Sequence, residues 1–306
     1  MSSEKIKLKD LTRDEYFFGH KACGGCGGSL ALRLALKVLG SRTFVAVPAG
    51  CMSAVGFIYP QLSFACNAMI STFPGTASML SGIAAGAKAL KLQDYNVVGF
   101  AGDGGTADIG IQALSGAIDR NDKIIYICYD NEAYMNTGIQ RSGLTPLGAK
   151  TTTTPIGKNI SGNRTHKKNM FEIVAAHKIQ YAATASVGYI QDFVNKIEKA
   201  RKVNGTSYIH VYAPCPTGWN CDSDLTIELG RDIVKNGLWI LAEYENEHFI
   251  INKDIKKFSN VREYFSKQGR FKNLSEEDIL KIEENRDKEW ERIRKHWNNC
   301  QIKNEN

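Results

Sequence analysis

The stretch YNVVGFAGDGG, residues 95–105, decides the fold, because a strand-like apolar run ends there directly in Gly102-Asp103-Gly104-Gly105. A second apolar run, IIYICY at 124–129, ends in the same way in Asp130-Asn131. With a helix predicted over 106–119 between them, the two runs form a βαβ unit, in which the strands are parallel and the crossover is right-handed. The polar residues that follow both strands should therefore lie at one edge of the same sheet.

These polar residues are suited to binding a metal and a diphosphate. The carboxylate of Asp103 and the amide oxygen of Asn131 become neighbouring hard ligands. Such oxygens suit Mg²⁺, which usually holds few protein ligands together with water and a substrate phosphate. Gly102, Gly104 and Gly105 let backbone N–H groups approach phosphate oxygens closely. A hydrogen-bonded turn aspartate with a helix cap is the alternative, but the strand–turn–helix context favours the metal site.

The α/β alternation continues along most of the chain. Strands are predicted over 43–47, 180–186 and 207–213, helices over 29–39, 76–90, 170–177, 189–203 and 225–236, and a hairpin over 238–252. This order predicts an α/β fold with a mostly parallel sheet and helices on both faces.

Two further segments differ from this pattern. The long polar stretch 131–169 follows Asn131 directly, and a loop of this length inside a compact domain is usually functional or disordered. Its position favours function. From about residue 253 the composition shifts to charge, and Ser275 is the predicted N-cap of a long charged helix ending near Trp297. We therefore divide the chain into a cofactor-binding domain, 1–252, and a charged helical C-terminal extension, 253–306.

The composition is that of an ordinary globular protein, with 306 residues, 43% hydrophobic and 23% charged. The net charge of +7 is mild and no basic-aromatic stripe is present, so nucleic-acid binding is not indicated. No segment has the length and apolarity of a membrane span. The N-terminus, MSSEKIKLKD, lacks the apolar core of a secretory signal. Eight cysteines in such a chain indicate a reducing, cytoplasmic location and metal or redox roles.

Four cysteines lie in or beside Gly- or Pro-rich segments: Cys23, Cys26, Cys51 and Cys215. Four thiolates can hold either Zn²⁺ or a [4Fe–4S] cluster, and the spacing alone does not decide between them. One CxxC with two single cysteines favours iron–sulfur, since structural zinc commonly uses two CxxC pairs. Cys221 is an alternative to Cys215 as the fourth ligand, although the Pro-Cys-Pro-Thr-Gly frame favours Cys215. The remaining cysteines, Cys66, Cys128 and Cys300, are interpreted as small buried hydrophobes or incidental thiols.

Five sequence blocks together resemble one protein family: GHKACGGCGG (19–28), AGC (49–51), GDGGTADIG (102–110), YDNEAYMNTGIQRSG (129–143) and APCPTGW (213–219). The family is that of the thiamine diphosphate (ThDP)-binding β subunits of 2-oxoacid:ferredoxin oxidoreductases, and its pyruvate-acting members fit best. The likeness covers roughly residues 15–245. A lone GDG would be weak, whereas five blocks in order, with the cysteines in place, are specific.

The resemblance implies roles for individual residues. Cys23, Cys26, Cys51 and Cys215 would bind one [4Fe–4S] cluster close to the ThDP. The Mg²⁺ would be held by Asp103, the side chain of Asn131 and the backbone carbonyl of Ala133. Asn136 matches the asparagine near the reactive thiazolium and is the expected catalytic residue. The full expected cofactor-binding set is Cys51, Gly102, Asp103, Gly104, Gly105, Asn131, Ala133, Asn136 and Thr137.

The resemblance also implies a reaction and partners. Pyruvate, coenzyme A and oxidised ferredoxin would give acetyl-CoA, CO₂ and reduced ferredoxin, reversibly. The partners would be the α-, γ- and δ-type subunits of one complex, together with ferredoxin. ThDP enzymes generally need a glutamate against the aminopyrimidine, and this chain offers no convincing one, so we expect the α subunit to supply it. The alternatives are another 2-oxoacid (2-oxoglutarate, branched-chain or oxalate), or a non-redox ThDP decarboxylase or lyase with a structural zinc.

Overall fold

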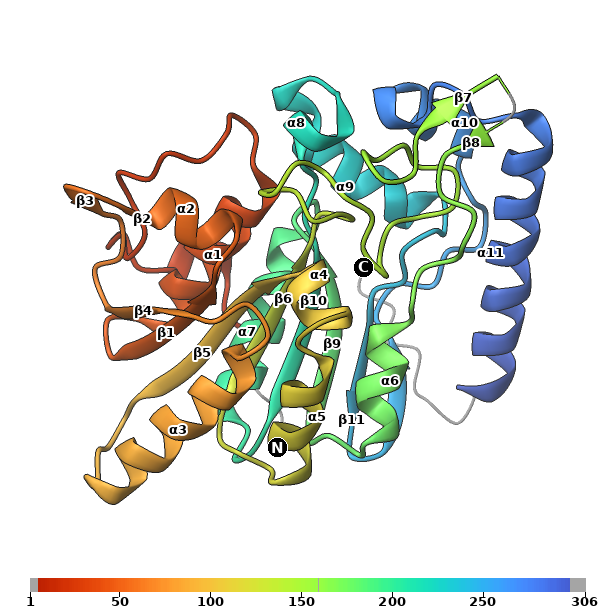
Figure 1. Cartoon of the computed structure of the whole chain (residues 1–306). Coiled ribbons are helices and arrows are strands. Elements are labelled where there is room, and N and C mark those ends of the chain that lie inside the picture. The colour runs from red at the N-terminus through yellow and green to blue at the C-terminus, as the bar shows by residue number, and fades with distance from the viewer. Residues whose placement is uncertain (1–4, 159, 298–306) are drawn as a thin grey trace.

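The computed structural model describes residues 5–158 and 160–297. Its centre is an eight-stranded sheet in the order β12-β11-β9-β10-β6-β5-β1-β4 (Figure 1). The parallel strands are β1 (Thr43–Pro48), β4 (Asn67–Ser71), β5 (Asn96–Gly102), β6 (Ile125–Asp130), β9 (Tyr181–Ser186) and β10 (Ser207–Tyr212). The predicted hairpin forms β11 (Ala242–Glu245) and β12 (His248–Ile251), which extend the sheet in antiparallel fashion.

Helices cover both faces of the sheet, as predicted (Figure 1). One face carries α1 (Gly27–Leu39), α2 (Cys51–Gly56) and α7 (Ile190–Lys202), and the other carries α3 (Thr76–Ala89), α5 (Ile111–Asp119), α6 (Met170–Ala176) and α9 (Thr226–Lys235). The alternation of side chains along a strand assigns each core. Val98 and Phe100 of β5 join the core under α1 and α7, whereas Val97 and Ala101 join the opposite core.

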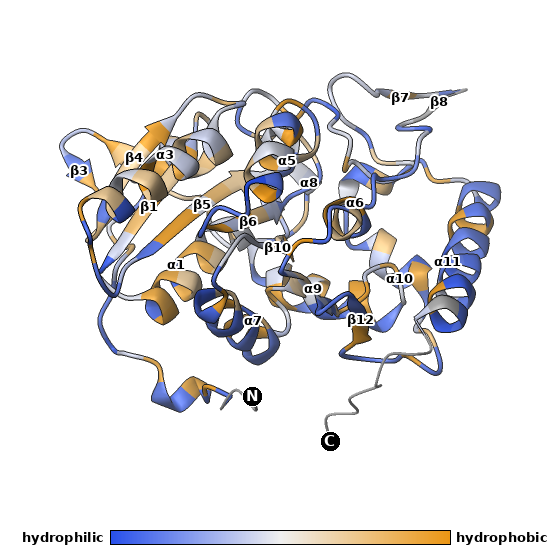
Figure 2. Cartoon of the chain, turned by 90° about the horizontal axis from the view of Figure 1, so that it is seen from below, coloured by the Kyte–Doolittle hydropathy of each residue, from blue (hydrophilic) through white to orange (hydrophobic). Residues whose placement is uncertain are grey.

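The C-terminal extension packs against the second of these cores. It comprises α10 (Val261–Ser266), the 3₁₀ turn Gly269–Phe271 and α11 (Glu276–His296), which begins at the predicted N-cap Ser275. Tyr264, Phe271 and Trp290 belong to the same buried cluster as strands β6 and β10. Figure 2 shows that α7 and α11 are mostly hydrophilic on the outside, while the strands between the helices are largely hydrophobic. The boundary at residue 252 stays a prediction.

The helix predicted over 106–119 was wrong in its bounds and continuity. A short helix, α4 (Asp103–Ala107), starts directly after β5, and the chain breaks at Asp108–Gly110 before α5 begins. A Cβ atom on Gly110 would lie 2.0 Å from the carbonyl oxygen of Gly105, so only glycine fits this close return. Asp108 is drawn out of the helix to accept hydrogen bonds from Tyr134 (3.0 Å) and the Gly143 N–H (2.9 Å).

The predicted loop 131–169 is largely irregular. It contains one two-residue hairpin, β7 (Ile156–Gly157) with β8 (Ile160–Ser161), and a bridge between Tyr134 and Gln140. The remaining short elements are the hairpin β2 (Phe57–Ile58) with β3 (Gln61–Leu62), the helix α8 (Pro216–Trp219), and 3₁₀ turns at Leu8–Asp10 and Ser223–Leu225. In the described part of the chain, no helix combines the length and apolarity needed to cross a bilayer.

Candidate active site

The ends of β5 and β6 lie side by side, as the sequence predicted. The two strands pair in parallel with Gly102 opposite Tyr129, so Asp103 and Asn131 follow them at one edge of the sheet. A cavity of about 40 Å³ at this edge is lined by every residue of the expected cofactor-binding set: Cys51, Gly102, Asp103, Gly104, Gly105, Asn131, Ala133, Asn136 and Thr137. The rings of Phe73 and Tyr134 complete its wall. A Cβ atom on Gly104 would lie 2.5 Å from the Tyr134 ring, so glycine is required for this fit.

Three polar groups converge in this cavity. One terminal atom of the Asn131 amide lies 2.9 Å from both Oδ1 of Asp103 and the carbonyl oxygen of Ala133, and as Nδ2 it donates a hydrogen bond to each of them. All three residues are buried. With the amide turned over, its oxygen would lie beside the other two, and a cation among the three would offset their repulsion. The donor set, a carboxylate, an amide oxygen and a carbonyl, is the kind that Mg²⁺ prefers, so these residues fit the ion.

Burial makes the charge of Asp103 costly in the chain by itself. Burial and then the neighbouring Asp130 raise the pKa of Asp103 well above its usual range, although the Ser142 hydroxyl donates a hydrogen bond to its Oδ2. A buried carboxylate is stabilised by an adjacent positive charge, which a divalent ion would supply. The electrostatics of Asp103 are therefore those of an incomplete cation site.

Charged side chains pack beside the cavity at the ends of β5 and β6, which we call the cradle. The sequence analysis did not predict these charged residues. Asp130, at the end of β6, lies 2.8 Å from Nζ of Lys167 and 3.0 Å from Nε2 of His210. Glu132 contacts Lys167 and Arg270, each at 2.6 Å. Only the place of Asp130 and Glu132 beside Asn131 could have drawn attention to them; Lys167 and Arg270 come from distant segments without a local motif.

The four expected cluster cysteines line a second cavity, of about 290 Å³, together with Asn131 and Asn136. Cys26 is the N-cap of α1 and Cys215 that of α8, and each sulfur accepts a backbone N–H at 3.4 Å, from Ser29 and Gly218 respectively. Cysteine 221 is not among the lining residues. The geometry thus groups Cys215, rather than Cys221, with Cys23, Cys26 and Cys51.

Two of the thiols in this cavity, Cys51 and Cys215, are not prepared for ionisation in the chain by itself. Burial, together with the charges of Cys215 and Cys26, raises the pKa of Cys51 to about 12, and burial raises that of Cys215 to about 12. Metal binding deprotonates thiols and offsets this repulsion. Among the residues that the structure describes, no three His, Cys, Asp or Glu side chains converge closely enough to hold a metal as they stand. The four sulfurs therefore share one cavity without forming a closed ligand set.

The fold and the cradle define a ThDP-binding protein. Residues 48–211, more than half of the chain, match the family described as "Thiamine pyrophosphate enzyme, C-terminal TPP binding domain". Among solved structures, a 2-oxoglutarate:ferredoxin oxidoreductase from Magnetococcus marinus has a TM-score of 0.54 at 20% identity, covering 74% of this chain and 81% of that one. At this identity the likeness concerns the fold alone.

Curated relatives narrow the family. The chain is 49% identical to pyruvate synthase subunit PorB of Methanothermobacter thermautotrophicus, over 87% of this chain and 92% of the relative. It is 48% identical to ketoisovalerate oxidoreductase subunit VorB of Pyrococcus horikoshii, over 95% of this chain and 97% of the relative. The chain therefore belongs to the PorB/VorB family of β subunits of 2-oxoacid:ferredoxin oxidoreductases, as its sequence blocks indicated, and is part of an oxidoreductase.

Proposed function

We propose that this chain is the ThDP-, Mg²⁺- and [4Fe–4S]-binding subunit of a 2-oxoacid:ferredoxin oxidoreductase that acts on pyruvate and coenzyme A. The observation that carries the proposal is the convergence of the Asp103 carboxylate, the Asn131 amide and the Ala133 carbonyl at the shared end of β5 and β6, where turning the amide would bring three oxygens together. The match to a ThDP-binding family supports the identity of the cofactor that this ion would anchor.

Each residue of the cradle has a proposed task. Asp103, Asn131 and the carbonyl of Ala133 hold Mg²⁺, while Gly102, Gly104, Gly105 and Thr137 line the space for the diphosphate. Asn136 lines both the cradle and the cysteine cavity, which supports its role as the catalytic residue beside the reactive end of the cofactor. Cys51 also lines both cavities, so it would lie between the two cofactors.

The cysteine cavity is the proposed cluster site. Cys23, Cys26, Cys51 and Cys215 would hold a [4Fe–4S] cluster, with the Ser29 and Gly218 N–H groups donating to two of the sulfurs. When bound, ThDP supplies the electron sink for decarboxylation of a 2-oxoacid, and an adjacent cluster accepts the released electrons one at a time. The common wall of the two cavities supports this pairing, which a structural zinc would not explain.

The substrate is proposed as pyruvate, with a branched-chain 2-oxoacid as the second candidate. The PorB relatives are named for pyruvate synthase, but the VorB relative matches at nearly the same identity and over more of this chain. The 2-oxoacid contacts and the glutamate for the aminopyrimidine are assigned to a partner α-type subunit. In the described part of the chain, no glutamate lines either cavity.

The experiment is to co-express the chain with its partner subunits, purify the complex anaerobically and compare 2-oxoacids. We expect brown protein whose visible absorbance is bleached by dithionite, and coenzyme A-dependent ferredoxin reduction that is fastest with pyruvate. Fastest turnover with 3-methyl-2-oxobutanoate would transfer the substrate assignment to the branched-chain class. Colourless protein with stoichiometric zinc would overturn the cluster and favour the non-redox alternative.

A further inference from the structure

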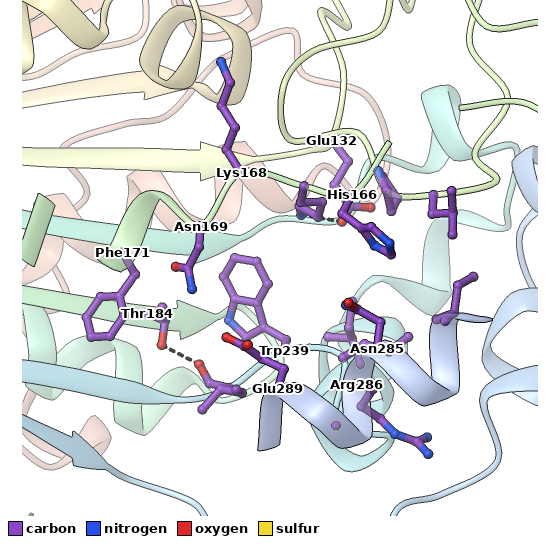
Figure 3. A pocket seen from close by; sticks show the side chains of 18 of the residues that line it. Glu132, His166, Lys168, Asn169, Phe171, Thr184, Trp239, Asn285, Arg286 and Glu289 are labelled. Carbon is purple, nitrogen blue, oxygen red and sulfur yellow. Dashed lines mark hydrogen bonds and ion pairs between the residues drawn. The ribbon is translucent and has the colours of Figure 1, made fainter. Parts of the chain in front are cut away.

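Glu132 occupies the position between the two residues assigned to the ion, Asn131 and Ala133. It is buried, with 2% of its surface exposed, and its φ of +67° is a left-handed conformation that a non-glycine residue rarely adopts. Its side chain does not line the cradle but a separate cavity of about 450 Å³, which Trp239 and Glu289 also line (Figure 3). Such backbone conformations persist only where the surroundings hold them in place.

Two cations, one from the far end of the same loop and one from the C-terminal extension, hold the Glu132 carboxylate. Nζ of Lys167, from the loop 131–169, lies 2.6 Å from Oε1. Nη2 of Arg270, from the C-terminal extension, lies 2.6 Å from Oε2 in an ion pair without hydrogen-bond alignment. Burial disfavours the charge of both cations, but the acidic neighbours raise the pKa of Lys167, and Glu132 raises that of Arg270. Both therefore stay charged.

The other contacts of Lys167 and Arg270 connect both cations with the turn at residues 130–133. Lys167 also lies 2.8 Å from Asp130, whose Oδ1 accepts the Glu132 N–H at 3.0 Å. The Arg270 guanidinium lies 3.8 Å from the centre of the Trp219 ring. The Trp219 indole N–H in turn donates to the carbonyl oxygen of Asn131 at 2.8 Å. A hydrogen bond from the Thr145 hydroxyl to the Glu132 carbonyl, at 2.7 Å, fixes the other side of the turn.

We infer that Glu132, clamped between Lys167 and Arg270, is a positioning residue that aims the oxygens of Asn131 and Ala133 at the metal. Arg270 thereby makes the C-terminal extension a functional part of the cofactor site. This inference rests on the proposed function, since it concerns the same Mg²⁺ and ThDP. Removing a group that contacts and orients a metal ligand typically changes the metal affinity by about 10–100-fold.

Arg294 is a control for the loss of a cation from the C-terminal extension, although its side chain is 39% exposed and that of Arg270 only 4%. Arg294 of α11 pairs with the buried Asp254 at 2.9 Å and lies 4.9 Å from the centre of the Trp290 ring. It thus resembles Arg270 in its partners, an acid and a tryptophan. Its hydrogen bonds and ion pair go to Asp254 and to the Ile255 carbonyl, away from the segment 131–133. Loss of Arg294 therefore tests for general destabilisation by a missing ion pair.

The experiment uses the assembled complex with its partner subunits, carrying Arg270→Met, Arg270→Lys or Arg294→Met. Equilibrium dialysis gives the Mg²⁺ concentration at which ThDP binding is half-maximal. We expect Arg270→Met to raise this concentration by about tenfold or more, and Arg270→Lys to raise it less, because lysine keeps the charge but lacks the planar fork. Arg294→Met should match the wild type.

The outcomes separate the inference from the function it rests on. Unchanged Mg²⁺ dependence in Arg270→Met, or an equal shift in Arg294→Met, would overturn the positioning role. If Arg270→Met does not assemble, Arg270→Lys decides alone, and a wild-type Mg²⁺ dependence there counts against the inference. A wild-type complex that binds no ThDP in a Mg²⁺-dependent way would instead overturn the proposed function.

Discussion

At the scale of single residues, the two oxygens of Asp103 are given different surroundings. The Ser142 hydroxyl donates to Oδ2, whereas Oδ1 faces the Asn131 amide at 2.9 Å and accepts a hydrogen bond from its nitrogen. Ser142 itself is fixed by Leu144, whose N–H donates to the serine oxygen at 3.1 Å. One oxygen is therefore used to orient the carboxylate, and the other faces the cavity, where the proposed cation would take the place of the amide donor.

Replacing Asp103 by asparagine should remove ThDP retention at limiting Mg²⁺. The variant Asp103→Asn keeps the shape of the side chain but loses the only carboxylate among the described residues that line the cradle. Because the affinity of a site for Mg²⁺ depends strongly on the charge of its carboxylate ligand, we expect ThDP binding to weaken at least about tenfold. ThDP per chain after desalting, with and without EDTA, is the measurement. Asp122→Asn, which loses only a surface pair with Arg120, is the control; wild-type retention in Asp103→Asn would contradict the metal assignment.

Replacing single cysteines by serine should show whether Cys215 or Cys221 is the fourth ligand of the proposed cluster. Cys215 lines the cysteine cavity, whereas Cys221 does not, so Cys215→Ser should lose the iron and the dithionite-sensitive absorbance. Cys221→Ser should keep both. Iron per chain and visible spectra of anaerobically purified complexes measure this. The opposite pattern would assign the ligand to Cys221, and retention of iron in both variants would remove the fourth ligand from this segment.

At the scale of elements, the sequence was informative wherever a pattern is local. Apolar runs ending in polar residues located β5 and β6, and with them Asp103 and Asn131 at one edge. The break between α4 and α5 was missed, because it depends on Gly110 returning against Gly105 and on Asp108 leaving the helix for Tyr134. Gly105 and Gly110 are near neighbours in the sequence, but the break also depends on Tyr134, which lies too far from Asp108 along the chain for a local pattern to reveal the contact.

The charges behind the cradle were missed for the same reason. In the sequence, Glu132 is only the residue after Asn131, and nothing local connects it with its partners Lys167 and Arg270 further along the chain. Its positive φ likewise has no signature in a non-glycine residue. Residues that bind directly follow local motifs, whereas residues that orient them depend on the tertiary fold.

Ion pairs at the surface connect the N-terminal arm, the segment before α1, with that helix. Glu15 lies 2.6 Å from Nη2 of Arg33 and 2.8 Å from Nζ of Lys37, both on α1. Hydrogen bonding to Arg33, opposed by burial and aided by Lys37, lowers the pKa of Glu15 from 4.5 to about 2. A carboxyl with a lowered folded-state pKa stabilises the fold above its unfolded pKa, and this stability is lost as the pH falls from about 4.5 to about 2.

Glu15→Gln should therefore lower the free energy of unfolding at pH 7 by about 0.2–1 kcal/mol, the range for an exposed pair. The difference from wild type should shrink as the pH falls below about 4.5. Urea titrations at pH 7, 4 and 3 measure it. The control is Glu284→Gln, whose partner Lys288 lies 3.9 Å away on exposed α11. A difference that is constant with pH would show that the arm is held by packing rather than by this charge.

At the scale of the whole molecule, the residues that line the cradle and the cysteine cavity do not make a complete active site by themselves. The cradle measures about 40 Å³, and the adjoining cysteine cavity about 290 Å³, with Asn131 and Asn136 shared between them. Glu132, which follows Asn131 directly, is committed to Lys167 and Arg270. The arrangement supports a site whose remaining wall comes from another subunit.

The purified chain alone should therefore show no turnover with pyruvate, coenzyme A and an electron acceptor, even when Mg²⁺, ThDP and iron–sulfur cluster are supplied. The physical reason is that the described residues lining the two cavities include the proposed metal ligands but no glutamate that could promote ionisation of the cofactor. Adding the separately purified partner subunits should restore the activity. Partner subunits assayed without the chain serve as the control. Robust turnover by the chain alone would contradict the half-site, and the aminopyrimidine glutamate would then have to be found within these 306 residues.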